Sequence, residues 1–244
     1  MNTQAPNNLK LYALHGFLGC KSDWNSFDPA SFNVDQIIAI DPFQQRSVDS
    51  LKAWAASFTS KIDEPKTHQN ILMGYSLGGR LALHALVEQP SLWKAAVIIS
   101  AHPGLTDEEE KKHRLEQDKQ WARRFLAEPW GPLLQTWNQQ GTLLTSQPLQ
   151  RKQADYDRIT LAYALQCLSL VLQDDLRPAI AALPFPILWL TGEKDEKYTA
   201  LARDLVYSHP HSSFQVVPGS GHRVPWDQPH LFQTRVRDWL AKIG

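Results

Sequence analysis

Residues 71–80 read ILMGYSLGGR, and Ser76 stands at the centre of this stretch between Gly74 and Gly78. One apolar run leads into the serine and another follows it. The spacing G-x-S-x-G is that of a nucleophile elbow, a strand-to-helix turn in which the serine is strained and the flanking chain passes too close for a Cβ. The stretch therefore predicts a reactive serine at such a turn, with an ordinary helix-capping serine as the alternative.

The sequence around the elbow alternates short apolar runs with longer amphipathic ones. Four runs are predicted to be buried strands: 9–16, 34–41, 70–76 and 95–102. Apolar side chains recur at helical spacing over 48–61 and 77–89. Strands that are apolar on both faces and alternate with helices are typical of a parallel sheet covered by helices. The predicted fold class is α/β, with a mostly parallel sheet flanked by helices.

This alternation stops after Gly104. From Thr106 to about Asp175 the chain is rich in Gln, Arg, Lys and Trp, keeps a helical period and contains no convincing strand. Thr106 and Glu109 have the spacing of a capping box, which predicts that a helix starts there. The segment is therefore expected to be a helical insertion into the α/β domain.

Strand-and-loop units return after the insertion. Residues 185–196 and 213–222 each read as a strand followed by a loop, and an amphipathic helix is expected near 228–242. The predicted division is an α/β core with one cap insertion: core 1–104 and 176–244, helical cap 105–175.

The composition bounds the kind of protein. The 244 residues are 43% hydrophobic and 20% charged, which suits a globular chain with a buried core. Basic and acidic side chains number 25 each, so the formal net charge is zero. A neutral chain has no broad electrostatic reason to bind nucleic acid or an anionic membrane, and any anion it binds must be held by a local cluster.

The cysteine spacing and the search for targeting or membrane-spanning segments bear on where the protein is located. Cys20 and Cys167 are far apart and lack the spacing of metal ligands, which favours free thiols in a reducing compartment. The first residues show no secretory signal, and no window approaches the roughly 20 apolar residues of a spanning helix. We expect a cytoplasmic protein with no metal and no membrane insertion, either a monomer or a small homo-oligomer.

A reactive serine needs a base, and the base needs a carboxylate to orient it. In proteins with this elbow, the three residues follow in the order Ser, Asp, His, the last two on loops after strands. Asp195 follows the strand FPILWL, and His222 follows SFQVV inside PGSGH. Glu193 and Glu196 are rival carboxylates, but Asp195 lies deepest in its turn. We predict a catalytic triad of Ser76, Asp195 and His222.

The loop after the first strand, LHGFLG at 14–19, suits an oxyanion hole. The backbone N–H groups of Phe17 and Leu77 are predicted to hold a negative oxygen that develops during the reaction. His15 in the same loop is expected to be structural.

These features resemble the α/β-hydrolase fold over nearly the whole chain. Four stretches are more specifically similar to the MenH family, the 2-succinyl-6-hydroxy-2,4-cyclohexadiene-1-carboxylate synthases of menaquinone biosynthesis: GYSLGGR, AHPGLTDEEEKKHRLEQDKQWARRFL, LLQTWNQQ and GEKDEKY. The elbow is common to very many hydrolases, whereas the arginine after it and the insertion are more specific. The resemblance implies an elimination of pyruvate that uses the triad as a base and no cofactor.

The same resemblance implies which side chains hold the polycarboxylate substrate: Tyr75, Arg80, Arg114, Trp137 and Arg158. Such a substrate needs fixed guanidinium groups, because Arg pairs bidentately with carboxylates and keeps its charge. Arg80 in the first turn of a helix opposes the helix dipole, and anion binding gives it a reason to be there. Taken alone, Arg114 and Arg158 also fit the solvated face of a helix.

One loop departs from the family, and two other functions stay open. The family usually has D-x-P-G-H-G after the second strand, whereas AIDPFQQRSV at 39–48 lacks those glycines, so we expect an altered loop beside the site. A carboxylesterase or thioesterase acting through an acyl-serine would use the same triad. A catalytically inactive fold used for binding is the third possibility, although a binding module has no reason to keep all three triad residues.

Overall fold

The computed structural model describes residues 8–44, 49–62 and 68–243. Its centre is one six-stranded sheet in the order β2-β1-β3-β4-β5-β6, and every neighbouring pair is parallel. The strands are β1 Leu9–Leu14, β2 Gln36–Ile40, β3 Gln69–Tyr75, β4 Trp93–Ile99, β5 Ile187–Gly192 and β6 Ser213–Val217. The predicted parallel sheet is therefore confirmed.

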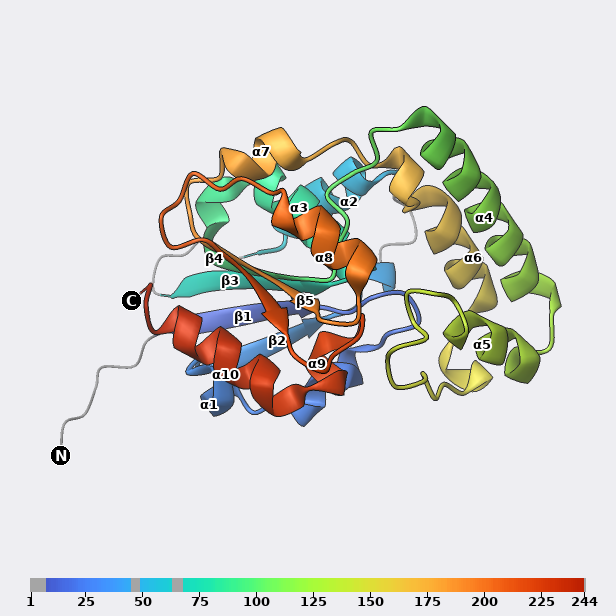
Figure 1. The fold of residues 1–244 in the computed structure, drawn as a ribbon, viewed down its shortest axis with the longest axis horizontal. Coiled ribbons are helices and arrows are strands. Elements are labelled where there is room, and N and C mark those ends of the chain that lie inside the picture. Colours follow the sequence, from blue (N-terminus) through green and yellow to red (C-terminus); the bar gives the residue numbers. More distant parts are fainter. Residues whose placement is uncertain (1–7, 45–48, 63–67, 244) are drawn as a thin grey trace.

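Helices flank this sheet on both sides (Figure 1). They are α1 Pro29–Phe32, α2 Leu51–Thr59, α3 Leu77–Glu88, α4 Glu108–Ala127, α5 Trp130–Asn138, α6 Arg158–Cys167, α7 Arg177–Ala181, α8 Glu196–Arg203, α9 Val224–Asp227 and α10 Pro229–Leu240. Short 3-10 turns lie at Lys21–Ser26, Pro42–Gln44, Pro90–Leu92, Gln153–Asp155 and Leu170–Leu172. None of the helices in the described residues has both the length and the apolar character that a bilayer crossing requires.

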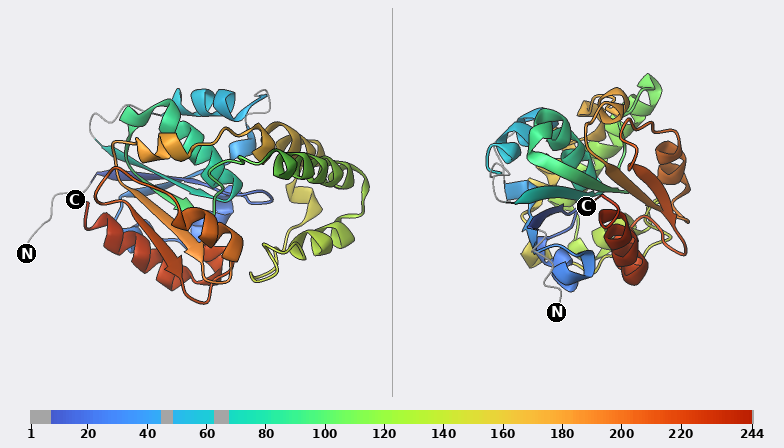
Figure 2. Two further views of the ribbon diagram at one scale, coloured as in Figure 1. Left: turned by 45° about the horizontal axis from the view of Figure 1, so that its top comes forward. Right: turned by 90° about the vertical axis from the view of Figure 1, so that its left-hand side faces the viewer.

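Two apolar clusters fill the layers on either side of the sheet. One cluster joins the sheet to α2, α3, α7 and α8, and the other joins it to α1, α9 and α10 (Figures 1 and 2). Along β3, Leu72 packs into the first cluster while Ile71 and Met73 pack into the second. This alternation follows from the twofold period of a strand, and it explains why the strand reads as a continuous apolar run.

The strand order reverses between β1 and β3, because β2 lies on the far side of β1. Loops at the carboxyl ends of strands on either side of such a reversal leave a crevice where ligands bind in open α/β sheets. Ser76 follows directly after β3, and the Gly16–Phe17 loop follows β1. The topology therefore brings the elbow and the predicted oxyanion loop to the same place.

Helices α4, α5 and α6 lie beyond the carboxyl ends of the strands (Figures 1 and 2). A third apolar cluster holds them together and includes Leu18 from the loop after β1. The helix α4 starts one residue later than predicted: Asp107, not Thr106, is its N-cap, and the Asp107 carboxylate accepts the N–H of Glu110 at 2.7 Å. We propose that residues 105–175 form the cap over the core, because this cluster is built mainly from them.

Helix α3 lies directly on the sheet and carries a buried histidine. His84 is 5% exposed, and its Nε2 has no hydrogen-bond partner in the described part of the chain. Burial, reinforced by the positive charge of Arg80, lowers the pKa of His84 from 6.5 to about 4. The folded protein therefore keeps this ring neutral at a pH where the unfolded chain protonates it.

We expect His84 to make the protein less stable as the pH falls from 6.5 to about 4, because the unfolded state then binds a proton that the folded state does not. The contribution is about 1.4 kcal/mol per pH unit and about 3 kcal/mol in total. Urea unfolding of wild type and His84→Gln across this range checks it. The unfolding free energy of wild type should fall relative to that of His84→Gln as the pH is lowered, by up to about 3 kcal/mol. A difference between the two proteins that does not change with pH would contradict the expectation.

Candidate active site

The turn between β3 and α3 has the backbone of a nucleophile elbow. Ser76 has φ 53° and ψ −115°, a conformation that costs a residue with a Cβ about 1–3 kcal/mol. A Cβ on Gly78 would lie 2.4 Å from the carbonyl oxygen of His15, and one on Gly74 would lie 2.4 Å from that of Gly78. The Ser76 side chain makes no capping hydrogen bond, so the helix-cap alternative finds no support.

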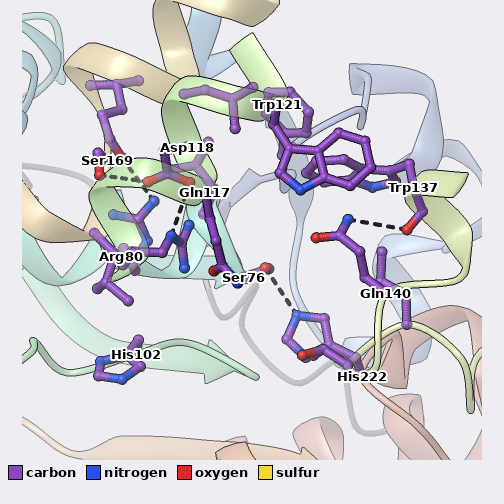
Figure 3. Close-up of a pocket in the computed structure, with 18 of the residues that line it drawn as sticks. Ser76, Arg80, His102, Gln117, Asp118, Trp121, Trp137, Gln140, Ser169 and His222 are labelled. Atoms are coloured by element: carbon purple, nitrogen blue, oxygen red, sulfur yellow. Dashed lines mark hydrogen bonds and ion pairs between the residues drawn. The ribbon is translucent and has the colours of Figure 1, made fainter. Parts of the chain in front are cut away.

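The side chains predicted as a triad meet in the expected order. His222 Nε2 lies 3.0 Å from Ser76 Oγ (Figure 3). On the other side of the ring, His222 Nδ1 lies 2.7 Å from Asp195 Oδ2. Asp195 and His222 are each 3% exposed. This is the arrangement in which a serine can pass its proton to a histidine whose orientation is held by a carboxylate. Of the rival carboxylates, Glu193 accepts the N–H of Gly219 at the surface, and Glu196 is exposed.

Two backbone N–H groups flank the serine. Leu77 is the first residue of α3, so its N–H has no acceptor within its own helix. The loop that holds Phe17 passes close to the serine, since a Cβ on Gly16 would lie 3.3 Å from the Ser76 Cβ. Phe17, Leu77 and Ser76 line one cavity. The structure therefore brings the two residues that are predicted to supply the oxyanion donors close to the serine.

This cavity has a volume of about 510 Å³ and lies between Ser76 and the helices of the cap (Figure 3). That volume suits a small-molecule ligand. Besides the triad residues, its polar side chains come from α3, α4, the segments after β4 and β5, and the segments after α5 and α6: Arg80, His102, His113, Arg114, Gln117, Asp118, Gln140, Thr142, Ser169, Lys197 and Tyr198. In the described residues, no group of three or more His, Cys, Asp and Glu is placed to hold a metal ion.

Arg80 is a buried cation whose hydrogen bonds, among the described residues, go to neutral acceptors. Its Nη2 donates to the carbonyl of Leu168 at 2.8 Å and its Nη1 to Gln173 Oε1 at 3.5 Å. It pairs with no carboxylate among the described residues. Burial and the nearby Arg114 guanidinium lower the pKa of Arg80 to about 10, so the side chain is still charged near neutral pH. A buried charge of this kind is stabilised when an anionic ligand supplies the missing partner.

Arg114 reaches the same cavity from the cap. Its Nε donates to Asp118 Oδ1 at 2.9 Å, and Asp118 Oδ2 accepts the hydroxyl of Ser169 at 2.6 Å. Asp118 is buried, whereas the Arg114 side chain is 31% exposed. The carboxylate thus fixes the direction of the guanidinium group while part of the group stays accessible to a ligand.

Trp137 and Tyr75 take different places. The Trp137 ring lines the cavity and packs against Phe17 and Trp121, with ring centroids 4.7 and 4.8 Å apart. The Tyr75 ring is buried beside His222 and Trp226, at centroid distances of 5.5 and 5.0 Å. Tyr75 lines a smaller adjoining cavity instead of the main one.

Arg158 corrects the sequence expectation. It is the first residue of α6, it does not line the cavity, and its guanidinium group donates to the backbone carbonyl of Glu128 at the end of α4. A cation is favoured at a helix C-terminus, where carbonyl groups lack partners within the helix. Arg158 therefore holds two cap helices together, and Arg80 and Arg114 are the predicted arginines that share the cavity.

The altered loop after β2 lies only partly in the described residues. Phe43 packs its ring against His15 and Phe17, with centroids 5.6 and 6.4 Å apart, while residues 45–48 lie outside the described part. His15 itself is buried, with its Nδ1 bonded to the carbonyl of Gly16 at 2.8 Å. Phe43 thus packs against the loop that is predicted to form the oxyanion hole.

Several cavity residues were missed from the sequence. Gln117, Asp118 and Trp121 follow Arg114 at spacings of three, four and seven, so they form one face of α4. This helical spacing could have identified them from the sequence. His102 and Tyr198 could have been identified only by a weaker indication, namely that each follows the end of a strand. Burial, helped by surrounding cations, lowers the pKa of His102 to about 3, which keeps its ring neutral.

Comparison with known proteins identifies the family of this chain. The model of the alpha/beta hydrolase family matches residues 11–233. The chain is 31% identical to the 2-succinyl-6-hydroxy-2,4-cyclohexadiene-1-carboxylate synthase of Escherichia coli O1:K1 / APEC, over 90% of this chain and 88% of that protein. It is 30% identical to the synthase of the same name from Enterobacter sp. (strain 638), over 90% and 86%.

Solved structures share the fold. The structure of MenH from S. aureus superposes with a TM-score of 0.85 at 21% identity, covering 99% of this chain and 96% of that one. A thermophilic esterase from Thermogutta terrifontis gives a TM-score of 0.64 at 19% identity, covering 96% and 90%. The fold is thus shared with proteins of more than one activity.

The strain at Ser76 gives a stability prediction. Glycine adopts φ 53° and ψ −115° without a clash, whereas alanine keeps the strain and loses only the hydroxyl. Ser76→Gly should therefore be more stable than Ser76→Ala by about 1 kcal/mol, after the greater backbone entropy of glycine is subtracted. Urea unfolding of the two variants measures this difference. An alanine variant equal to or more stable than the glycine variant would contradict a strained elbow.

Proposed function

The chain belongs to the alpha/beta hydrolase family and, within it, to the 2-succinyl-6-hydroxy-2,4-cyclohexadiene-1-carboxylate synthases, and from this membership we propose that it eliminates pyruvate from 2-succinyl-5-enolpyruvyl-6-hydroxy-3-cyclohexene-1-carboxylate. It is an enzyme of menaquinone biosynthesis. The observation that supports the elimination best is the buried Arg80 guanidinium, which lines the cavity above Ser76 and has no direct carboxylate partner among the described residues.

The chemistry follows from the two structures that the substrate and product names describe. The ring loses the proton at C2, next to the succinyl carbonyl, and its C5–O bond to the enolpyruvyl group breaks. One ring double bond at C3 becomes two, at C2 and C4. The enolpyruvate that leaves takes up one proton on carbon and becomes pyruvate, so no proton is gained or lost overall.

In the proposed mechanism, Ser76 is a base and not a nucleophile. His222 accepts the proton of Ser76 Oγ across their 3.0 Å hydrogen bond, and the serine oxygen removes the C2 proton. Asp195 stabilises the charge that the histidine then carries. The electron pair left at C2 spreads to the succinyl oxygen, which the N–H groups of Phe17 and Leu77 hold.

The substrate has carboxylates on the ring, on the succinyl chain and on the enolpyruvyl group. Arg80 and Arg114 are proposed to bind two of them, because both line the cavity and Arg80 has no carboxylate partner within the described ranges. Trp137 and Phe17 supply an aromatic wall for the ring. A neutral ester gives a buried guanidinium group nothing to pair with, so this charge favours the elimination over ester hydrolysis.

Incubation of the purified protein with the enolpyruvyl substrate should release pyruvate, measured by a coupled lactate dehydrogenase assay. Ser76→Ala should lower kcat by about 10²–10⁴-fold, because the proton acceptor is lost. A burst of p-nitrophenol from p-nitrophenyl acetate, with an acyl group on Ser76 seen by mass spectrometry and no pyruvate released from the enolpyruvyl substrate, would favour the esterase alternative.

Arg80→Gln should raise KM and lower kcat together, reducing kcat/KM by about 10–100-fold, because a charge-assisted contact is lost in both the ground and transition states. Arg114→Gln should act in the same direction. Arg123→Gln is the matched control, since Arg123 lies on α4 together with Arg114 but pairs with Glu116 at the surface. Equal kinetics of the Arg80→Gln and Arg123→Gln enzymes would contradict the assignment.

A further inference from the structure

A second, smaller cavity of about 50 Å³ adjoins the main one. The two cavities share five residues: Phe17, Ser76, Trp137, Leu143 and His222. They therefore meet at the serine and histidine of the triad. A ligand in the main cavity that extends past Ser76 and His222 has this small space to enter.

Arg223 lines the smaller cavity and is 8% exposed. Its backbone N–H donates to Ser146 Oγ at 3.0 Å, and its Nη1 donates to the carbonyl of Gln147 at 2.6 Å. Its Cζ lies 5.3 Å from the centre of the Trp226 ring. The cap loop and the tryptophan thus fix the guanidinium group in place, and one of its nitrogens is engaged with a neutral carbonyl.

No carboxylate of the described residues pairs with Arg223, although two lie nearby. Asp23 lines the same cavity, but Arg151 Nη2 binds both of its oxygens, at 2.8 and 2.7 Å. These two charges cancel. Of the two arginines that line the smaller cavity, Arg223 is therefore the one that pairs with no carboxylate among the described residues.

The other nearby carboxylate, Asp227, is occupied by backbone and hydroxyl donors. Its Oδ2 accepts the N–H of Gly221 and the hydroxyl of Ser146, at 2.9 and 2.7 Å, and its Oδ1 accepts the N–H of Gln147 at 3.1 Å. Asp227 lowers the net positive charge of the region without making an ion pair with Arg223. The guanidinium group keeps donors for a ligand.

Tyr75 adds a neutral donor to the same cavity. Burial raises the pKa of Tyr75 well above its ordinary value, so the hydroxyl keeps its proton, and the positive charge of Arg223 acts against that rise. Tyr75 and Arg223 both line this cavity. Together they offer the donors that one carboxylate needs.

We infer that this cavity is the subsite for the leaving group, with Arg223 binding the carboxylate of the enolpyruvyl unit and of the pyruvate formed from it. The choice of ligand rests on the proposed function. Arg80 and Arg114 account for two of the three substrate carboxylates, and Arg158 lies elsewhere. The small volume admits a three-carbon unit better than the ring with its succinyl chain.

Pyruvate itself is the probe, with binding followed by saturation-transfer NMR of its methyl group. Wild type should bind pyruvate at millimolar concentration, and Arg223→Gln should weaken this binding about tenfold or more. Succinate is the second probe: Arg80→Gln should weaken its binding, and Arg223→Gln should change it by less than about twofold. Arg237→Gln removes an exposed guanidinium paired with Asp238 and is the control for charge alone.

Arg223→Lys keeps the charge and most of the packing, and serves if the glutamine variant does not fold. It should weaken pyruvate binding about threefold or more, because an ammonium group cannot replace the planar fork. Pyruvate affinity within about twofold of wild type in either folded variant overturns the subsite. Absence of millimolar binding to wild type, or loss of binding in Arg80→Gln instead, also overturns it.

These outcomes separate the subsite from the proposed function. Release of pyruvate from the substrate by wild type, combined with unchanged pyruvate affinity in Arg223→Gln, keeps the elimination and removes the subsite. Binding of free pyruvate through Arg223, combined with no release from the substrate, keeps the anion site and removes the proposed reaction.

Discussion

The strained backbone of Ser76 is the constraint on which the rest of the site depends. The Ser76 N–H donates to the carbonyl of Ile99 at 2.9 Å, and its own carbonyl accepts the N–H of Arg80 at 3.0 Å. The residue is therefore tied to β4 on one side and to α3 on the other. Burial of most of α3 against the sheet offsets a strain of about 1–3 kcal/mol, which a short or exposed helix would not do. The hydroxyl is consequently presented to the cavity without being used as a helix cap.

The cap contributes to the base as well as to the cavity. Gly221 and Arg223, the two neighbours of His222, are held by Asp227 and Ser146, and Ser146 belongs to the cap loop. A Cβ on Gly221 would lie 2.6 Å from Ser146 Oγ, so the loop sits directly on the histidine segment. The position of His222 is therefore set from both the core and the cap. Displacement of the cap loop is expected to disturb the base even where the sheet stays intact.

What the sequence predicted depended on whether the signal was local. Ser76, Asp195 and His222 each sit at the end of a predicted strand, so their meeting followed from a parallel sheet alone. The structure does not bring Arg158 to the cavity as predicted. A helical period indicates which face of a helix carries a residue, but it does not indicate which neighbouring helix that face contacts. The sequence did not single out Arg223, the residue after His222. Its lack of a carboxylate partner among the described residues depends on Asp23 being bound by Arg151. Charge balance in a cavity is a tertiary property.

A chain of zero net charge can still be selective for an acidic ligand, because some of its basic side chains pair with carboxylates and others do not. Basic side chains at the surface can pair with a carboxylate, as Arg123 does with Glu116 and Lys52 with Asp174. Arg80 and Arg223 are instead buried, and their cavities meet at Ser76 and His222. Electrostatic interactions of buried charged groups are stronger than those of groups at the surface. If the proposed function holds, these two guanidinium groups, which pair with no carboxylate among the described residues, favour a substrate with separated carboxylates.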